Sequence, residues 1–189
     1  MVGYNFEEDG SAAGKDHSRS ARKGPLFRRK AVYALGRHDL WAARSVFAEG
    51  LLTVVTGIAD TGFLVAFANR NDEHHDWAVG VAERVTAPLL TCEAVLSEAA
   101  FHLQSVSVVL ALLREGLVAL AFDCRDHLPQ LETLAERYAD RHPDFADLCL
   151  VRMSELHPRH SVVTVDRDDF RVYRRNKRDT IPLICPPEI

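Results

Sequence analysis

The feature of this sequence that most limits its fold is the alternation of short apolar runs with amphipathic segments from residue 51 onward. Runs such as 117–122 predict buried strands, whereas Trp77, Val81 and Val85 recur at four-residue spacing, which is typical of a helix. Strands that alternate with helices build a parallel sheet covered on both faces. We therefore expect an α/β fold, a three-layer α/β/α sandwich with a central parallel sheet.

The positions of the expected elements follow from these patterns and from the turn residues between them. Gly116 is a plausible end for the helix before it, and Pro182 favours an edge position for the last strand because an edge tolerates proline. The expected strands are 52–59, 88–90, 117–122, 161–165 and 181–184, and the expected helices are 61–68, 73–85, 92–103, 106–114, 126–139 and 144–156.

The beginning of the chain differs from the rest in charge and pattern. Residues 1–53 carry 9 basic and 6 acidic residues, a net charge of +3, whereas residues 54–189 carry 14 and 21, a net charge of −7. Residues 1–30 show neither helical nor strand periodicity. We expect residues 1–50 to be a basic N-terminal extension, disordered or weakly helical and dispensable for the activity of the rest of the chain, and residues 51–189 to form the functional domain.

Composition and charge exclude several classes of protein. The chain is 47% hydrophobic and 26% charged, which is a globular composition. It has no apolar run of the ~18 residues that a membrane helix needs, and its acidic start at Glu7, Glu8 and Asp9 is unlike a signal peptide. The formal net charge of −4 argues against a basic body that binds nucleic acid over its whole surface.

The four cysteines give no sign of a zinc or disulfide framework. They are widely separated and form no C-x-x-C pair, so we expect buried free thiols in a reducing, cytoplasmic environment. They are Cys92, Cys124, Cys149 and Cys185.

Two of the expected strands end in an aspartate. Asp60 follows Ile58-Ala59, and Asp166 follows residues 163–165. In an open α/β sheet ligands bind beyond the carboxyl ends of the strands, at the point where the strand order reverses. If these strands are neighbours there, the two carboxylates converge.

Two expected helices add further acids to this pair. Glu98 stands in an otherwise nearly apolar segment, and Asp144 and Asp147 are three residues apart on one helical face. Carboxylates that are crowded and partly dehydrated repel one another, and a bound divalent cation offsets the repulsion. Oxygen-only ligands favour Mg²⁺ or Mn²⁺. Taken singly, Asp60 and Asp144 are better explained as helix caps, which is the commoner role, and Glu98 is equally well explained as a solvated helix residue.

Four stretches of the sequence, taken in order, resemble the PIN domain, and more narrowly the VapC-type toxin ribonucleases of bacterial type II toxin–antitoxin systems. The resemblance covers roughly residues 55–183 and leaves residues 1–50 outside. The stretches are 58–66 (IADTGFLVA), 90–100 (LTCEAVLSEAA), 144–151 (DFADLCLV) and 163–170 (VTVDRDDF).

The resemblance implies a Mg²⁺-dependent endoribonuclease, with Mn²⁺ as a possible substitute. It implies a catalytic and metal-binding quartet of Asp60, Glu98, Asp147 and Asp166, with Asp144 and Asp169 as supporting acids. It also implies a cognate antitoxin protein that inserts an arginine into the acidic groove, a homodimer, and RNA, with transfer RNA as a candidate, as substrate. Apolar residues between 101 and 113 suit either the dimer interface or the core.

Other residues complete the expected site. Thr61 and Thr164 have hydroxyls that we expect to orient metal-bound water. Basic residues directly after Asp166 are the candidates for holding the RNA backbone, because an acidic pocket alone repels phosphate. They are Arg167, Arg171, Arg174 and Arg175.

Three alternatives remain open at this point. The first is a catalytically inactive PIN module that binds RNA or protein. The second, a haloacid-dehalogenase-type phosphatase, requires a second aspartate two positions after the first, where this chain has Gly62. The third is a phosphoacceptor receiver domain, which needs an acidic pair after the first strand and a lysine after the last, and neither is clear.

Overall fold

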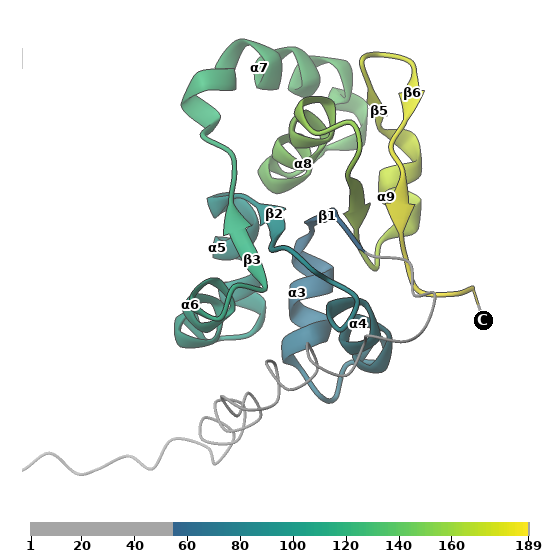
Figure 1. Cartoon of the computed structure of the whole chain (residues 1–189). Helices are drawn as coiled ribbons and strands as arrows, with labels where there is room; N and C mark the ends of the chain where they lie inside the picture. The colour runs from purple at the N-terminus through teal and green to yellow at the C-terminus, as the bar shows by residue number, and fades with distance from the viewer. Residues whose placement is uncertain (1–54, 189) are drawn as a thin grey trace, which may run out of the picture.

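The computed structural model describes residues 55–188, in which a five-stranded parallel sheet forms the centre of the fold (Figure 1). The strand order is β3-β2-β1-β4-β7, so β3 and β7 are the edges. The strands are β1 (Gly57–Ala59), β2 (Leu89–Thr91), β3 (Val118–Leu120), β4 (Ser161–Val163) and β7 (Leu183–Ile184).

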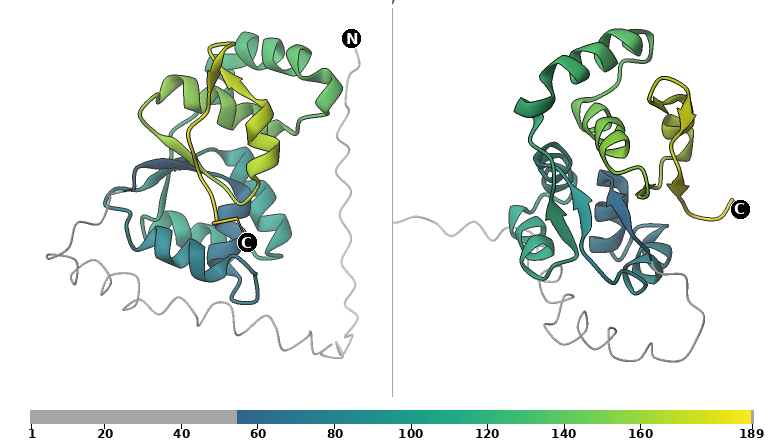
Figure 2. Two further views of the ribbon diagram at one scale, coloured as in Figure 1. Left: turned by 90° about the vertical axis from the view of Figure 1, so that its right-hand side faces the viewer. Right: turned by 45° about the horizontal axis from the view of Figure 1, so that its top comes forward.

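Helices cover both faces of this sheet, and the expected three-layer α/β sandwich with a central parallel sheet is confirmed. Figures 1 and 2 show α3 and α4 on one side and α7 and α8 on the other. Among the described helices, none is long and apolar enough to cross a membrane. The helices are α3 (Thr61–Ala68), α4 (His75–Ala82), α5 (Glu93–His102), α6 (Val106–Arg114), α7 (Leu128–Arg137), α8 (Phe145–Leu156) and α9 (Arg167–Val172).

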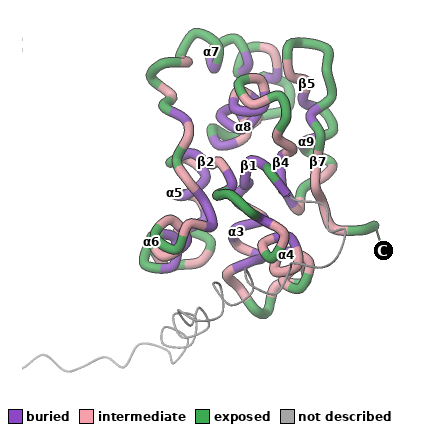
Figure 3. The backbone as a smooth tube through the Cα atoms, in the orientation of Figure 1, coloured by how far each residue is buried: buried purple, intermediate pink, exposed green. Residues whose placement is uncertain are grey.

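The core lies between the sheet and the helices packed on it. Figure 3 shows the buried residues gathered in the central strands and in the adjoining parts of α3, α5 and α8. Phe63 of α3 and Leu150 and Met153 of α8 are fully buried, as is Ile58 in the central strand. Burying such side chains contributes roughly 1.5–3 kcal/mol each, which holds both helical layers against the sheet.

The thiols follow the expectation for free cysteines. All four are unpaired; Cys92 and Cys149 are buried, while Cys124 and Cys185 are half-buried. The prediction of free thiols is therefore confirmed, although only two of them are fully buried.

The structure corrects several predicted boundaries. The strand expected at 161–165 ends at Val163, and the helix expected at 126–139 is a 3₁₀ turn, η3 (Cys124–His127), followed by α7. Pro129 lies in the first turn of α7, where its missing N–H breaks no helical hydrogen bond, so the α-helix begins there. The predicted extension at 1–50 lies outside the described residues.

Two elements near the end of the chain were not predicted. The helix α9 is short and highly charged, so it has no apolar stripe, and the hairpin of β5 (Arg174–Arg175) and β6 (Asp179–Thr180) contains few residues that favour strands. Its turn places Asn176 and Lys177 at φ values of 51° and 71°. Asn tolerates this left-handed conformation, which is the only local signal for the turn.

The close approach of β1 to β4 gives a test of the packing. A Cβ on Gly57 would lie 2.8 Å from both the Ser161 carbonyl oxygen and Val163 Cγ2, whereas a Cβ on Gly80 in α4 meets nothing within 4 Å. We expect Gly57→Ala to lower the free energy of unfolding by about 1–3 kcal/mol because β4 must shift. Gly80→Ala, the matched control, should raise it by about 0.5–1 kcal/mol. Urea unfolding of both variants measures this, and equal effects would contradict the packing.

Candidate active site

A cleft of about 390 Å³ opens at the carboxyl ends of the central strands, and acidic side chains dominate its walls. The parallel register of β1 with β4 pairs Gly57 with Ser161 and Ala59 with Val163, so the segments after both strands reach the same edge of the sheet. The structure brings together all six acids predicted for the site. They are Asp60, Glu98, Asp144, Asp147, Asp166 and Asp169.

Asp60 is the most buried of these acids, with 8% of its surface exposed. Its Oδ1 accepts a hydrogen bond from the Thr61 backbone N–H at 2.6 Å at the start of α3, and its Oδ2 accepts one from Thr164 Oγ1 at 2.6 Å. Burial raises the pKa of Asp60 to about 6, although these hydrogen bonds favour the ionised form. Asp60 is therefore both a helix cap and a wall of the cleft.

Thr61 connects Asp60 to Glu98 on α5. Its hydroxyl lies 2.8 Å from Glu98 Oε2 and donates to it, and Glu98 Oε1 lies 3.8 Å from His102 Nε2. The hydroxyls of Thr61 and Thr164 were expected to orient metal-bound water. Each donates its single proton to a carboxylate and keeps its lone pairs as acceptors, so its role toward metal-bound water stays a prediction.

Asp147 lies in the first turn of α8 and faces the same cleft. Its backbone N–H donates to Asp144 Oδ1 at 2.7 Å, which makes Asp144 the cap of α8, and its Oδ2 accepts a hydrogen bond from the Tyr173 hydroxyl at 3.0 Å. Burial first, and then the charge of Asp144, raise the pKa of Asp147 to about 7. Burial and the nearby charge of Asp147 likewise raise the pKa of Tyr173.

The fourth acid of the quartet is held by the turn after β4. The backbone N–H of Asp166 donates to Thr164 Oγ1 at 2.9 Å, and its Oδ1 accepts a hydrogen bond from the Asp169 N–H at 3.1 Å at the start of α9. Burial, followed by the charge of Asp166, raises the pKa of Asp169. Thr164 thus contacts the two acids that follow neighbouring strands.

The chemistry of the donor set fits a hard divalent cation. No arginine or lysine lies within ion-pair distance of Asp60 or Asp147 in the described part of the chain, so their charges lack a protein counter-charge. Carboxylate oxygens suit Mg²⁺ or Mn²⁺. Within residues 55–188, however, no three His, Cys, Asp or Glu side chains are already arranged to hold a metal ion.

The structure adds residues that were not among those predicted for the site. Tyr173 holds Asp147 across 26 positions of sequence, a contact with no local signal, and His74 and His102 line the cleft. Gly62 leaves room for the neighbouring turn, because a Cβ there would lie 2.5 Å from Val165 Cγ2.

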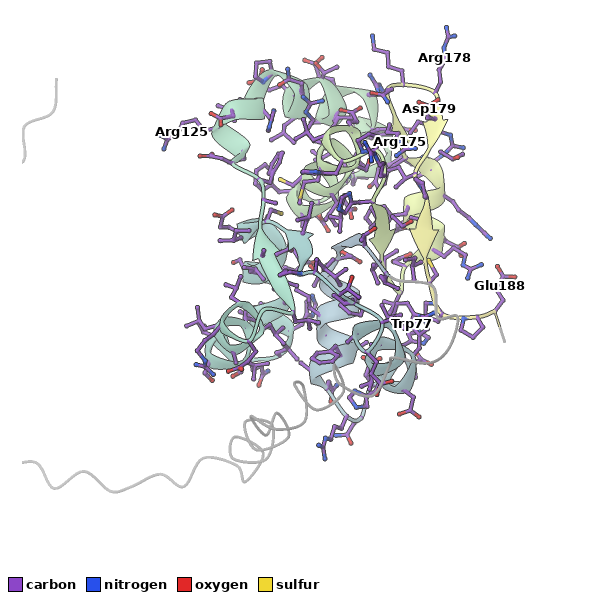
Figure 4. All side chains as sticks on the ribbon, viewed as in Figure 1. Trp77, Arg125, Arg175, Arg178, Asp179 and Glu188 are labelled. Carbon is purple, nitrogen blue, oxygen red and sulfur yellow. The ribbon has the colours of Figure 1, made fainter. Side chains whose placement is uncertain are left out.

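The four arginines predicted to bind RNA divide into two pairs. Arg167 and Arg171 line a second groove that adjoins the acidic cleft. Arg174 donates to the carbonyl oxygens of Arg171 and Tyr173, and Arg175 donates to the Pro158 carbonyl oxygen at 2.9 Å. Figure 4 shows Arg175 on the hairpin beside α8. The structure therefore groups only Arg167 and Arg171 with the acids.

The raised pKa of Asp147 predicts how stability depends on pH without metal. A carboxyl with a raised pKa contributes stability below its unfolded pKa of 3.8, and this contribution is lost as the pH rises through about 7. We expect Asp147→Asn to raise the free energy of unfolding at pH 8 in EDTA by about 1–2 kcal/mol, discounted because the side chain is only partly buried. At pH 5 this gain in the free energy of unfolding should be smaller, because Asp147 is then largely protonated in the folded protein.

Thermal unfolding at the two pH values measures this difference. Asp140→Asn is the matched control, because Asp140 has 76% of its side chain exposed and should change stability little at either pH. A loss of stability in Asp147→Asn of the same size at both pH values would contradict the prediction.

No protein-family model matches the chain, and a comparison with curated proteins finds no match. The evidence for a function of the cleft therefore consists of its acids, their burial and their neighbours.

Proposed function

We propose that this protein is a Mg²⁺-dependent endoribonuclease of the PIN type that hydrolyses RNA phosphodiester bonds as the toxin of a toxin–antitoxin pair. One observation carries the proposal. Asp60, Glu98, Asp147 and Asp166, which come from four separate elements, line a single cleft at the carboxyl edge of the sheet. The raised pKa values of Asp60 and Asp147 favour a site that a cation completes.

The residues divide into direct and indirect ligands. Asp60 and Asp147 are the best candidates for direct contact with Mg²⁺, while Glu98 and Asp166 complete the shell through water. When bound, the ion would lower the pKa of a water molecule and stabilise the charge on the phosphate. Thr164 and Tyr173 hold the carboxylates of Asp60 and Asp147 in fixed orientations, as partners behind metal ligands commonly do.

Removing a metal ligand should abolish cleavage. We expect Asp60→Asn or Asp147→Asn to reduce Mg²⁺-dependent cleavage of total RNA by at least about 100-fold, because the neutral amide supports the cation poorly. EDTA should do the same to the wild-type protein. Mapping the cleavage ends measures the activity, and Asp140→Asn is the control for a surface charge. Full activity in either active-site variant would exclude the proposed mechanism.

An inactive PIN module that binds RNA or protein is the alternative. It agrees with the finding that, within residues 55–188, no metal-holding group of three or more side chains is already arranged. Calorimetric titration with Mn²⁺ separates the two functions, because a nuclease site should bind the ion and lose this binding in Asp147→Asn. An inactive module should bind no Mn²⁺ tightly.

The proposed function includes an antitoxin protein as partner and a cytoplasmic location. An antitoxin that inserts an arginine would find acceptors in the same acids, because the guanidinium group matches carboxylates in charge and geometry. Transfer RNA is the candidate substrate. A cytoplasmic location is part of the proposal, since RNA and reduced thiols occur there together.

A homodimer is also part of the proposal, and the helices α5 and α6 support it. Phe101, Val106 and Leu110 have exposures of 78%, 64% and 56%, and the last two are four residues apart on α6 and share a face. Val109, by contrast, is buried at 4% exposure. The apolar residues between 101 and 113 therefore divide between the core and an exposed apolar surface of the kind that interfaces use.

A charge in this surface should prevent dimerisation. We expect the wild-type protein to sediment as a dimer and Leu110→Lys to sediment as a monomer, because a lysine there cannot be buried without a partner. Leu128→Lys is the control, since Leu128 is similarly exposed, at 48%, on a different helix. A wild-type monomer, or a Leu110→Lys dimer, would contradict this interface.

A further inference from the structure

A second groove, of about 550 Å³, adjoins the acidic cleft. The two share His74, Val165 and Asp166 in their walls. The other walls of the second groove come from α9, which supplies Arg167 and Arg171, and from residues 185–188. A chain that crosses the acidic cleft therefore has a continuous path past these two arginines.

The two arginines converge on one carboxylate oxygen. Glu188 Oε1 accepts hydrogen bonds from Arg167 Nη1 at 2.8 Å and from Arg171 Nη2 at 3.2 Å. Arginines also hold the anionic oxygens of phosphate by charge-assisted hydrogen bonds. The carboxylate of Glu188 thus occupies a position that suits a phosphate oxygen.

The two arginines differ in how firmly they are held. Arg167 also donates from Nη2 to the Pro186 carbonyl oxygen at 2.7 Å, and its side chain is 31% exposed. Arg171 is 57% exposed and has a second, longer ion pair of 3.4 Å with Asp168. Arg167 is therefore held in place, whereas Arg171 is free to follow a ligand.

The contact with Glu188 is one that a competing anion can replace. The Glu188 side chain is 71% exposed, and ion pairs in such positions contribute little to stability because water and salt screen them. A polyanion has an advantage over a single carboxylate, because when one phosphate leaves the two arginines a neighbouring phosphate of the same chain can take its place.

We infer that Arg167 and Arg171 form a binding site for a backbone phosphate of single-stranded RNA beside the acidic cleft, and that Glu188 occupies this site until RNA displaces it. The inference rests on the proposed function, since it takes RNA to be the substrate. Glu188 then acts as a competitor built into the chain, which weakens RNA binding without touching the acids of the cleft.

Binding of a fluorescein-labelled single-stranded RNA oligonucleotide to the full chain, measured by anisotropy in EDTA, tests the site without cleavage. Glu188→Gln should tighten binding about threefold, because it releases both arginines. Glu132→Gln is the control: it makes the same charge change at an exposed position on α7, which contributes no residue to the cleft or the groove, and should have little effect. Arg171→Gln should weaken binding about threefold and lower the salt dependence by about one phosphate contact.

A double-variant comparison separates local competition from a general charge effect. The gain from Glu188→Gln should largely disappear when Arg167 and Arg171 are both replaced by Gln, because the released partners are then absent. An equal gain in that background, or equal effects of Glu188→Gln and Glu132→Gln, would overturn the inference.

The outcomes distinguish this inference from the proposed function. If the wild-type protein cleaves RNA with Mg²⁺ but Glu188→Gln leaves binding unchanged, only the phosphate site is wrong. If RNA binds as expected but no variant cleaves it, the site stands and the nuclease proposal falls. If RNA neither binds nor is cleaved, both are wrong.

Discussion

The rest of the site depends on the two hydrogen bonds that the carboxylate of Asp60 accepts. Asp60 follows the central strand β1, caps α3 through the Thr61 N–H and accepts a hydrogen bond from Thr164 beside β4. One side chain therefore ties two neighbouring strands and a helix together at the edge of the sheet where ligands bind in α/β folds. Asp60 belongs both to the fold and to the candidate site, so a change at this residue affects both.

In the absence of metal, the buried carboxylates of this site lower the stability of the folded state near neutral pH. Burial raises the pKa of Asp60 to about 6 and that of Asp147 to about 7, which means that ionising them near neutral pH works against folding. Hydrogen bonds from Thr164 and Tyr173 offset part of this cost. Residues that oppose stability in this way are expected at functional sites, where chemistry and not packing determines the side chain.

The sequence indicated that Asp60 and Asp166 lie at the ends of strands, because strand-end aspartates carry a local signal, whereas long-range contacts carry none. The alternation of elements indicated a parallel sheet, but it did not establish that β1 and β4 are neighbours, on which the meeting of Asp60 and Asp166 depends. Tyr173 was missed because it meets Asp147 only through the tertiary fold. The hairpin that carries Arg174 and Arg175 was not predicted, because its strands are only two residues long.

The charges around the cleft bear on how an acidic domain would bind the RNA that we propose as its substrate. The net charge of −7 on residues 54–189 includes the four acids of the proposed quartet, whose charge a bound cation would offset. Arg167 and Arg171, which line the adjoining groove, form ion pairs with Glu188, and Arg171 also pairs with Asp168. In our proposal, an incoming phosphate backbone displaces these exposed carboxylates and makes the positive charge of the two arginines available. Attraction of a phosphate backbone would then arise at the site and not over the whole surface, which is consistent with the acidic composition of the domain.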